Sequence, residues 1–96
     1  MSYSLEFHPK ALKEWHKLNP TIKEQFKKKL KERLENPKVA KDKLSGLDSV
    51  YKIKLRSVGY RLAYRVKDEE IVVIVLGVGK RENSEIYKNI RERVAK

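Results

Sequence analysis

The chain lacks cysteine and is poor in histidine, and both shortages limit its chemistry. None of its 96 residues is cysteine, which excludes disulfides and thiolate catalysis. The two histidines, His8 and His16, do not lie at a metal-binding spacing from another histidine or a carboxylate. We therefore expect no bound metal and no cofactor.

Long apolar runs are also missing. The longest, residues 71–78, is interrupted by Gly77 and is too short to cross a bilayer. The first residues carry neither the charged region nor the apolar region of a signal peptide. These absences lead us to expect a cytoplasmic protein that does not act at a membrane.

Acidic residues are scarce relative to basic ones. The chain has 24 lysines and arginines against 13 aspartates and glutamates, which gives a formal net charge of +11 with histidine neutral. So large an excess on a small protein indicates a polyanionic partner, either nucleic acid or an anionic membrane. The length allows one hydrophobic core, so we expect residues 1–96 to form a single domain.

The first half of the chain predicts a strand followed by two helices. Residues 3–7 alternate apolar and polar side chains, the period of a strand with one buried face. Pro9 opens a short helix, and Asn19 with Pro20 supplies the cap and first position of a second helix, which ends at residues 36–37. The apolar stripe of this second helix comprises Ile22, Phe26, Leu30 and Leu34.

The second half predicts three strands and a last helix. After a loop at residues 38–49, the period changes to two in 51–56 and again in 61–66. Residues 71–78 are almost wholly apolar and β-branched, as in a central strand covered on both faces. Residues 83–84 can cap a final helix. The order β-α-α-β-β-β-α predicts an α+β fold, with a helix pair on one face of a mainly antiparallel sheet and a C-terminal helix.

Basic side chains concentrate on two of the predicted strands. The segment from Lys52 to Lys67 contains six basic residues and no acidic residue. Because successive strand side chains face opposite sides, burial of the apolar set directs the basic set outward. The expected outward cations are Lys52, Lys54, Arg56, Arg61 and Arg65.

The pairing of these two strands can also be predicted. A register that places Arg56 opposite Arg61 and Lys54 opposite Ala63 keeps both apolar sets on one side, whereas a slip of one residue would bury charges. This register requires a two-residue turn at residues 58–59 or a bulge. Like charges opposite one another are locally unfavourable, which favours a functional reason for them.

Cations on a sheet face suit one metal-free reaction, the cleavage of RNA by its own 2′-hydroxyl. The transition state carries additional negative charge that preorganised cations stabilise. A base is still needed, and neither histidine lies on the basic strands. Lys52 and Lys54 are crowded by like charges, which lowers a lysine pKa. Arg81 and Tyr87, near the end of the central strand, add a cation and a ring that can stack on a base.

Four segments resemble the RelE toxins of bacterial and archaeal toxin–antitoxin pairs. They are residues 11–15 (ALKEW), 51–57 (YKIKLRS), 59–62 (GYRL) and 78–82 (VGKRE). The similarity runs nearly end to end with matching spacing. It implies a ribosome-dependent, metal-independent endoribonuclease that cuts messenger RNA in the decoding site of the small subunit. The implied products are a 2′,3′-cyclic phosphate and a 5′-hydroxyl.

The resemblance also implies a role for each site residue. Lys54 would be the general base, while Lys52 and Arg61 would stabilise the transition state. Arg81 would assist the leaving group, and Tyr87 would stack on a base of the RNA. Three further cations are expected to contact the RNA: Arg56, Arg65 and Lys80.

One position departs from the resemblance, and the family implies two further partners. Some relatives carry an arginine where this chain has Ser45, which puts an auxiliary RNA contact in doubt. The family implies a cognate antitoxin that wraps the toxin, displaces the helix carrying Tyr87 and represses its own operon as a complex. Operator DNA is thus a partner only of that complex.

Three other interpretations remain open from the residues. Relatives with this fold poison DNA gyrase without cleaving RNA, although they lack the basic set. A plain nucleic-acid-binding module would use the cations only to neutralise phosphates. A solvated face that merely keeps the protein soluble is the third. The unmixed charges at residues 52–67 disfavour the last, since the lysines of the second helix are interleaved with glutamates.

Overall fold

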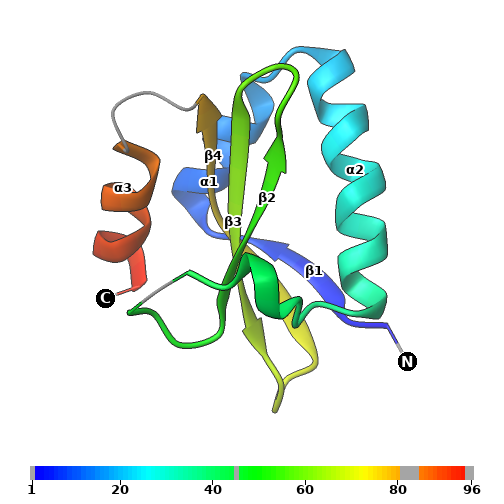
Figure 1. Cartoon of the computed structure of the whole chain (residues 1–96), viewed down its shortest axis with the longest axis vertical. Coiled ribbons are helices and arrows are strands. Elements are labelled where there is room, and N and C mark those ends of the chain that lie inside the picture. The colour runs from blue at the N-terminus through cyan, green and yellow to red at the C-terminus, as the bar shows by residue number, and fades with distance from the viewer. Residues whose placement is uncertain (1, 45, 81–84, 95–96) are drawn as a thin grey trace.

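A computed structural model describes residues 2–44, 46–80 and 85–94, with the side chains of 85–87 excepted. It confirms the predicted order of strands and helices, which Figure 1 shows, and adds one turn of 3-10 helix inside the expected loop. The elements are β1 (Ser4–Phe7), α1 (Pro9–His16), α2 (Pro20–Glu35), η1 (Ala40–Asp42), β2 (Val50–Leu55), β3 (Tyr60–Lys67), β4 (Val72–Lys80) and α3 (Glu85–Val94). Within these ranges no helix combines the length and apolarity that a membrane span needs.

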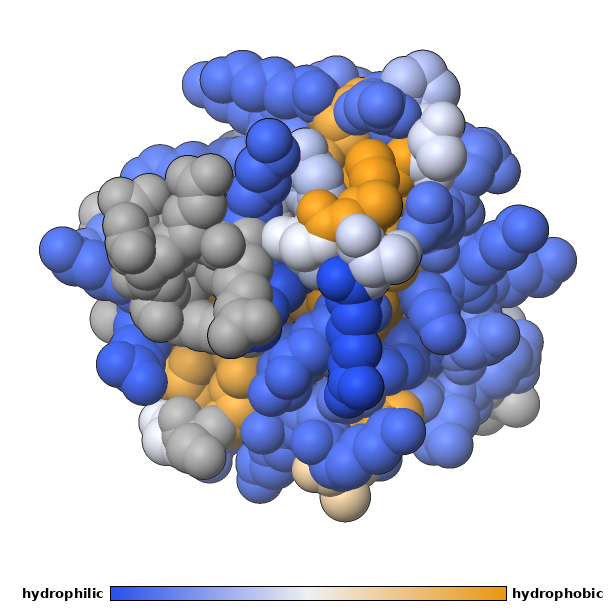
Figure 2. Space-filling view, turned by 45° about the horizontal axis from the view of Figure 1, so that its top comes forward, coloured by the Kyte–Doolittle hydropathy of each residue, from blue (hydrophilic) through white to orange (hydrophobic). Residues whose placement is uncertain are grey.

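The four strands form one sheet in the order β1-β4-β3-β2. The pairs β2–β3 and β3–β4 are antiparallel, whereas β1 runs parallel to β4 from Ser4–Val72 to Phe7–Val75. The sheet is therefore mainly antiparallel, as predicted, and β2 is an edge strand. On the face that Figure 2 shows, hydrophilic side chains predominate, with separate apolar patches between them.

The first two helices begin where the sequence indicates. The side chain of Asn19 accepts a hydrogen bond from the backbone N–H of Thr21 at 2.7 Å, and Pro20 occupies the first helical position. His8 caps α1 in the same way, because its Nδ1 accepts from the N–H of Lys10 at 3.2 Å. These caps satisfy N–H groups that have no partner inside the helix.

One face of the sheet carries the large core. Side chains of α1 and α2 meet the inward side chains of β2, β3 and β4 there. Phe26 of α2 and Tyr64 of β3 are fully buried at its centre. The chief contributors are Ala11, Trp15, Ile22, Phe26, Leu30, Tyr51, Ile53, Leu62, Tyr64, Val73 and Val75.

The opposite face carries a smaller core beneath α3. It is formed by Val50, Ala63, Leu76 and Ile90, and Ile90 of α3 is fully buried. Figure 1 shows α2 and α3 on opposite sides of the sheet. The sheet is thus covered on both faces, but α3 covers only part of its side.

The register predicted between β2 and β3 is wrong by two residues. Lys54 pairs with Arg61, not with Ala63, and a turn at residues 56–59 closes the hairpin. Gly59 adopts φ +70° and its N–H donates to the carbonyl of Leu55 at 2.9 Å. A shift of two residues leaves every side chain on its predicted face, so the burial pattern could not distinguish the two registers. The turn sets the register. A two-residue turn at residues 58–59 would require a positive φ at Val58 as well as at Gly59, whereas in the observed turn only Gly59 has one.

The central strand also begins one residue later than predicted. Ile71 lies in the preceding turn with φ 54° and is 41 % exposed. The strand runs from Val72 to Lys80 and contains an irregularity opposite Ala63 and Tyr64. The apolar pattern could not show that the turn ends on an isoleucine in the left-handed region.

Candidate active site

Three predicted site residues lie together on β2 and β3. Lys54 faces Arg61 directly across the ladder, and Lys52 follows on the same side of β2, opposite Ala63. All three cationic side chains are half-buried. We refer to Lys52, Lys54 and Arg61 as the cationic cluster.

The cationic cluster occupies the sheet face on which α3 docks. Val50, two residues before Lys52, belongs to the small core beneath α3, and side chains two apart on a strand share a face. Beside the cluster, Gly79 of β4 pairs with Arg61, and a Cβ placed on this glycine would meet no atom within 4 Å. On the side away from the α3 core, none of the described residues therefore covers Gly79 next to the cluster.

Electrostatics make Lys54 the strongest base candidate of the cluster. Its pKa is lowered from the ordinary lysine value, chiefly because the Lys52 side chain lies within hydrogen-bonding reach of it. The positive charge of Lys52, partial desolvation, and the charges of Arg61 and Arg56 act in the same direction. Like charges disfavour protonation, and an ammonium donor stabilises a neighbouring neutral amine. The predicted crowding of Lys54 is therefore confirmed.

Arg33 of α2 contacts the backbone of the cluster from the edge of the sheet. Its Nη1 donates to the carbonyl oxygen of Lys52 at 3.3 Å and to the hydroxyl of Tyr64 at 2.9 Å, and its Nη2 donates to Asp42 Oδ2 at 2.6 Å. The Tyr64 hydroxyl in turn donates to the carbonyl of Pro37 at 2.6 Å. The guanidinium thus ties α2, η1 and β3 to the edge strand at the position of Lys52.

Comparison with known proteins identifies the family. The family described as "ParE toxin of type II toxin-antitoxin system, parDE" matches residues 5–85. The mRNA interferase toxin RelE of Escherichia coli K12 is 55 % identical over 94 residues, which cover 98 % of this chain and 99 % of that protein. The chain is a RelE-type toxin.

Solved structures agree with this assignment. A mutant of E. coli RelE in the free state matches this RelE-type toxin with a TM-score of 0.91 and 54 % identity, over 98 % of this chain and 99 % of the other. RelE from the intact E. coli RelBE toxin–antitoxin complex matches with a TM-score of 0.83 and 56 % identity, over 85 % and 100 %. The fold class predicted from the order of strands and helices is confirmed.

The three additional RNA contacts predicted for this RelE-type toxin do not all join the cluster. Arg56 lies exposed in the hairpin turn, near enough for its charge to affect Lys54. Arg65 shares the face but follows Arg61 by four residues, or about 13 Å along the strand. Lys80 pairs with Tyr60, and its ammonium lies 6.0 Å from the centre of that ring, against the large core. Lys80 is therefore set apart from the cluster, on the other side of the sheet.

Three predicted positions fall outside what the structure describes. Arg81 and Ser45 lie outside the described residues. Tyr87 belongs to α3, but its side chain is not among those described. The roles predicted for Arg81 and Tyr87 therefore stay predictions. In the part of the chain that is described, no group of three or more histidine, cysteine, aspartate or glutamate side chains could hold a metal ion.

Sequence reasoning missed Arg33, although a signal for it existed. Arg33 follows Leu30 by three residues and Phe26 by seven, so it shares the apolar stripe of α2. A charged residue at such a position is directed toward the core, where it needs partners. Its side chain is 14 % exposed, in contrast to the lysines on the outer faces of the helix.

Proposed function

We propose that this RelE-type toxin is a ribosome-dependent endoribonuclease that cuts messenger RNA in the decoding site and so inhibits translation. The observation that carries the proposal is the cationic cluster, in which Lys54 has a lowered pKa and faces Arg61 beside Lys52. The name mRNA interferase, borne by a relative 55 % identical over nearly the whole chain, supports it.

In the proposed reaction the RNA supplies its own nucleophile. Neutral Lys54 accepts the proton of a 2′-hydroxyl, and the 2′-oxygen attacks the adjacent phosphorus. A bond from the 2′-oxygen to phosphorus forms while the bond from phosphorus to the 5′-oxygen breaks. The products are a 2′,3′-cyclic phosphate and a 5′-hydroxyl. Lys52 and Arg61 stabilise the negative charge that develops on the phosphoryl oxygens, more strongly in the transition state than in the ground state.

Two residues beyond the cluster act on the leaving 5′-oxygen and on the neighbouring base. We assign Arg81 to the leaving group, where its charge favours departure of the oxygen. Its role is electrostatic, because an arginine pKa above about 12 makes proton donation costly. We assign Tyr87 to stacking on a base, which orients the scissile phosphate. Arg56 is close enough to the cluster to bind a neighbouring phosphate.

Ribosome dependence follows from what the cluster does not supply. It offers a lysine base of modest strength, and among the residues that the structure describes no histidine or carboxylate is in contact with it. In such a site most of the rate must come from holding the 2′-oxygen in line with the leaving 5′-oxygen. We propose that the small subunit imposes this conformation on the messenger.

The partners of the proposed function are the ribosome with its messenger RNA and a cognate antitoxin. Support for the antitoxin comes from E. coli RelE, which has been solved in an intact RelBE complex. We propose that the antitoxin covers the toxin in the cytoplasm and displaces α3. The toxin–antitoxin complex would then bind operator DNA to repress its own operon.

The proposal is tested on ribosomes programmed with a defined messenger, by mapping the new 5′ ends. Wild-type protein is expected to cut within the decoding-site codon and to leave free RNA of the same sequence intact. Lys54→Ala should lower the single-turnover rate at least about 100-fold, with a much smaller change in ribosome affinity. Lys28→Ala removes the same charge from an exposed position on α2 and should leave that rate unchanged.

Three outcomes would contradict the proposal. An uncut messenger under conditions in which the toxin arrests growth would exclude cleavage. Intact messenger together with DNA breaks would favour gyrase poisoning. If Lys54→Ala weakened binding and its salt dependence but spared the single-turnover rate, the protein would be a nucleic-acid-binding module.

A further inference from the structure

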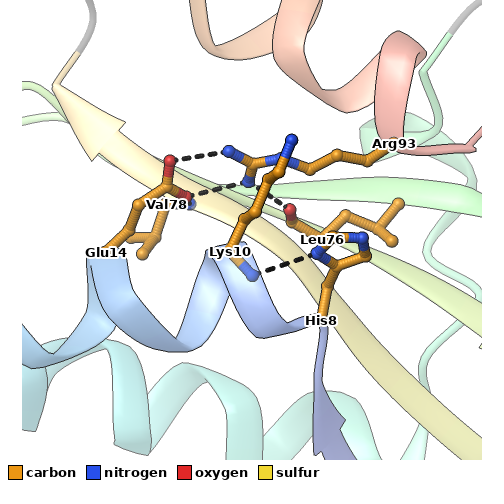
Figure 3. Close-up of polar contacts among 6 residues, drawn as sticks. All are labelled: His8, Lys10, Glu14, Leu76, Val78 and Arg93. Carbon is orange, nitrogen blue, oxygen red and sulfur yellow. Dashed lines mark hydrogen bonds and ion pairs between the residues drawn. The ribbon is translucent and has the colours of Figure 1, made fainter.

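Among the described residues, a largely buried ion pair joins helix α3 to helix α1. Arg93 of α3 donates from Nη1 to Glu14 Oε1 at 3.0 Å and from Nη2 to Glu14 Oε2 at 2.9 Å. The side chain of Arg93 is only 9 % exposed, and that of Glu14, on α1, is 32 % exposed. Figure 3 shows the two groups meeting over β4. Two parallel bonds between a guanidinium and a carboxylate fix orientation as well as distance.

The same two side chains satisfy the backbone of β4 where its neighbouring strand has ended. The pairing of β1 with β4 stops at Phe7 and Val75. Beyond that point Arg93 Nη1 donates to the carbonyl oxygen of Leu76 at 2.6 Å, and the N–H of Val78 donates to Glu14 Oε1 at 3.2 Å. The Glu14–Arg93 pair therefore takes the place of a strand, and loss of either partner would leave buried polar groups unsatisfied.

Gly77 allows the helix to approach the strand closely. A Cβ at this position would lie 2.7 Å from Ile90 Cδ1 and 2.8 Å from Arg93 Nη1. Ile90 is fully buried, so its side chain has little room to yield. The glycine between Leu76 and Val78 thus provides the space in which both contacts of α3 form.

The docked position of α3 depends on these contacts. The helix has ten residues, and isolated helices shorter than about 12 residues are marginal in water. Among its described side chains, the apolar contacts come from Ile90, which is buried, and Val94, which is partly buried. A crevice of about 200 Å³, lined by His8, Lys10, Asn89, Glu92 and Arg93, lies between α3 and the start of α1. The Glu14–Arg93 pair spans the two helices beside this crevice.

We propose that the Glu14–Arg93 pair is a positioning device that holds α3 on β4 and thereby places Tyr87 for the reaction. Tyr87 and Arg93 lie six residues apart on one helix, or about 9 Å along its axis, so an error in docking is transmitted to the first turn. Glu14 and Arg93 act through Tyr87 and touch no substrate. This inference rests on the proposed function for its catalytic consequence but not for the docking itself.

Hydrogen exchange of the amides of residues 85–94 tests the docking. Arg93→Gln should accelerate their exchange at least about tenfold, since it removes charge-assisted hydrogen bonds. Arg91→Gln, a matched change at an exposed position of the same helix, should leave it unchanged. Gly77→Ala should accelerate it without altering any charge. Exchange of the β3 amides serves as the check that the whole domain remains folded. Unchanged α3 exchange in Arg93→Gln would overturn the proposal.

Cleavage on programmed ribosomes tests the positioning. Arg93→Gln should lower the maximal single-turnover rate and spare ribosome affinity. In a Tyr87→Ala background the same change should cause no further loss, because the residue being positioned is absent. Equal losses in both backgrounds would indicate a merely structural role and overturn the positioning. If wild-type protein failed to cleave, the proposed function would fail, whereas the exchange experiment would still decide whether the pair holds α3.

Discussion

Lys54 faces Arg61 across the β2–β3 ladder, and the adjacent Lys52 side chain lowers the pKa of Lys54. Opposed cations destabilise a hairpin, so this arrangement costs stability that other contacts must offset. In return it increases the fraction of neutral lysine available near neutral pH. In the proposed reaction the cluster thus supplies both a base and fixed positive charges for the same phosphate.

The first prediction concerns the pH dependence of cleavage. If neutral Lys54 is the base, the single-turnover rate rises with pH until the pKa of Lys54 is passed. Because that pKa is lowered, the rise should end below the ordinary lysine value of about 10.4. Lys52→Met removes the largest cause of the shift, so the rise should move to higher pH. A control, Lys28→Met, should leave the profile in place, and an unmoved profile in Lys52→Met would contradict the assignment.

The second prediction concerns the hydroxyl of Tyr64, which joins Arg33 to Pro37. Tyr64→Phe leaves the carbonyl of Pro37 without its donor and removes one acceptor from Arg33. We expect the free energy of unfolding to fall by about 1–3 kcal/mol, measured by urea denaturation. Tyr51→Phe is the matched control, since the Tyr51 ring stacks on Tyr64 at 5.8 Å and its hydroxyl makes no hydrogen bond among the described residues. Equal losses in the two variants would show that the hydroxyl network adds nothing.

Periodicity predicted which side of the sheet each residue of β2 and β3 occupies. The side chains of Lys52, Lys54 and Arg61 share a face because alternation along a strand is a local geometric property. Pairing register is not local, and a shift of two residues preserves every face. The conformation of Gly59 resolves it, and that conformation depends on how the turn closes. The sequence therefore predicted the membership of the cluster but not that Lys54 stands directly opposite Arg61.

The polar contacts between helices and strands could not be predicted from periodicity, for a different reason. Glu14, Arg33 and Arg93 each occupy a position on the apolar stripe of a helix, where a charge signals a buried partner. The partner cannot be read from the pattern, because Glu14 and Arg93 are 79 residues apart. Their meeting depends on where β1 ends beside β4, which is a property of the assembled sheet.

The third prediction concerns the turn that sets the register. Gly59 has φ +70° with no atom near an added Cβ, so Gly59→Ala introduces backbone strain and no clash. We expect a loss of about 1–2 kcal/mol in the free energy of unfolding. Gly79→Ala is the control, because its surroundings are equally open and its φ is not positive. If Gly79→Ala cost as much, the left-handed conformation would not be the cause.

The fourth prediction concerns acid stability and the turn that follows β3. Asp68 bonds Lys38 and accepts from the Tyr3 hydroxyl at 2.8 Å, and these contacts lower the pKa of its carboxyl. A lowered native pKa contributes stability above the unfolded value of about 3.9, and this contribution disappears as pH falls through the native pKa. The free energy of unfolding of Asp68→Asn should therefore be lower than that of wild type at neutral pH, and the two values should converge in acid. The change should be small, since both charged side chains are about half exposed. The control is Glu69→Gln, an exposed change in the same turn, whose free energy of unfolding should vary with pH as that of wild type does.

If the difference in free energy of unfolding between wild type and Asp68→Asn stayed constant into acid, the charge of Asp68 would not be what stabilises this turn.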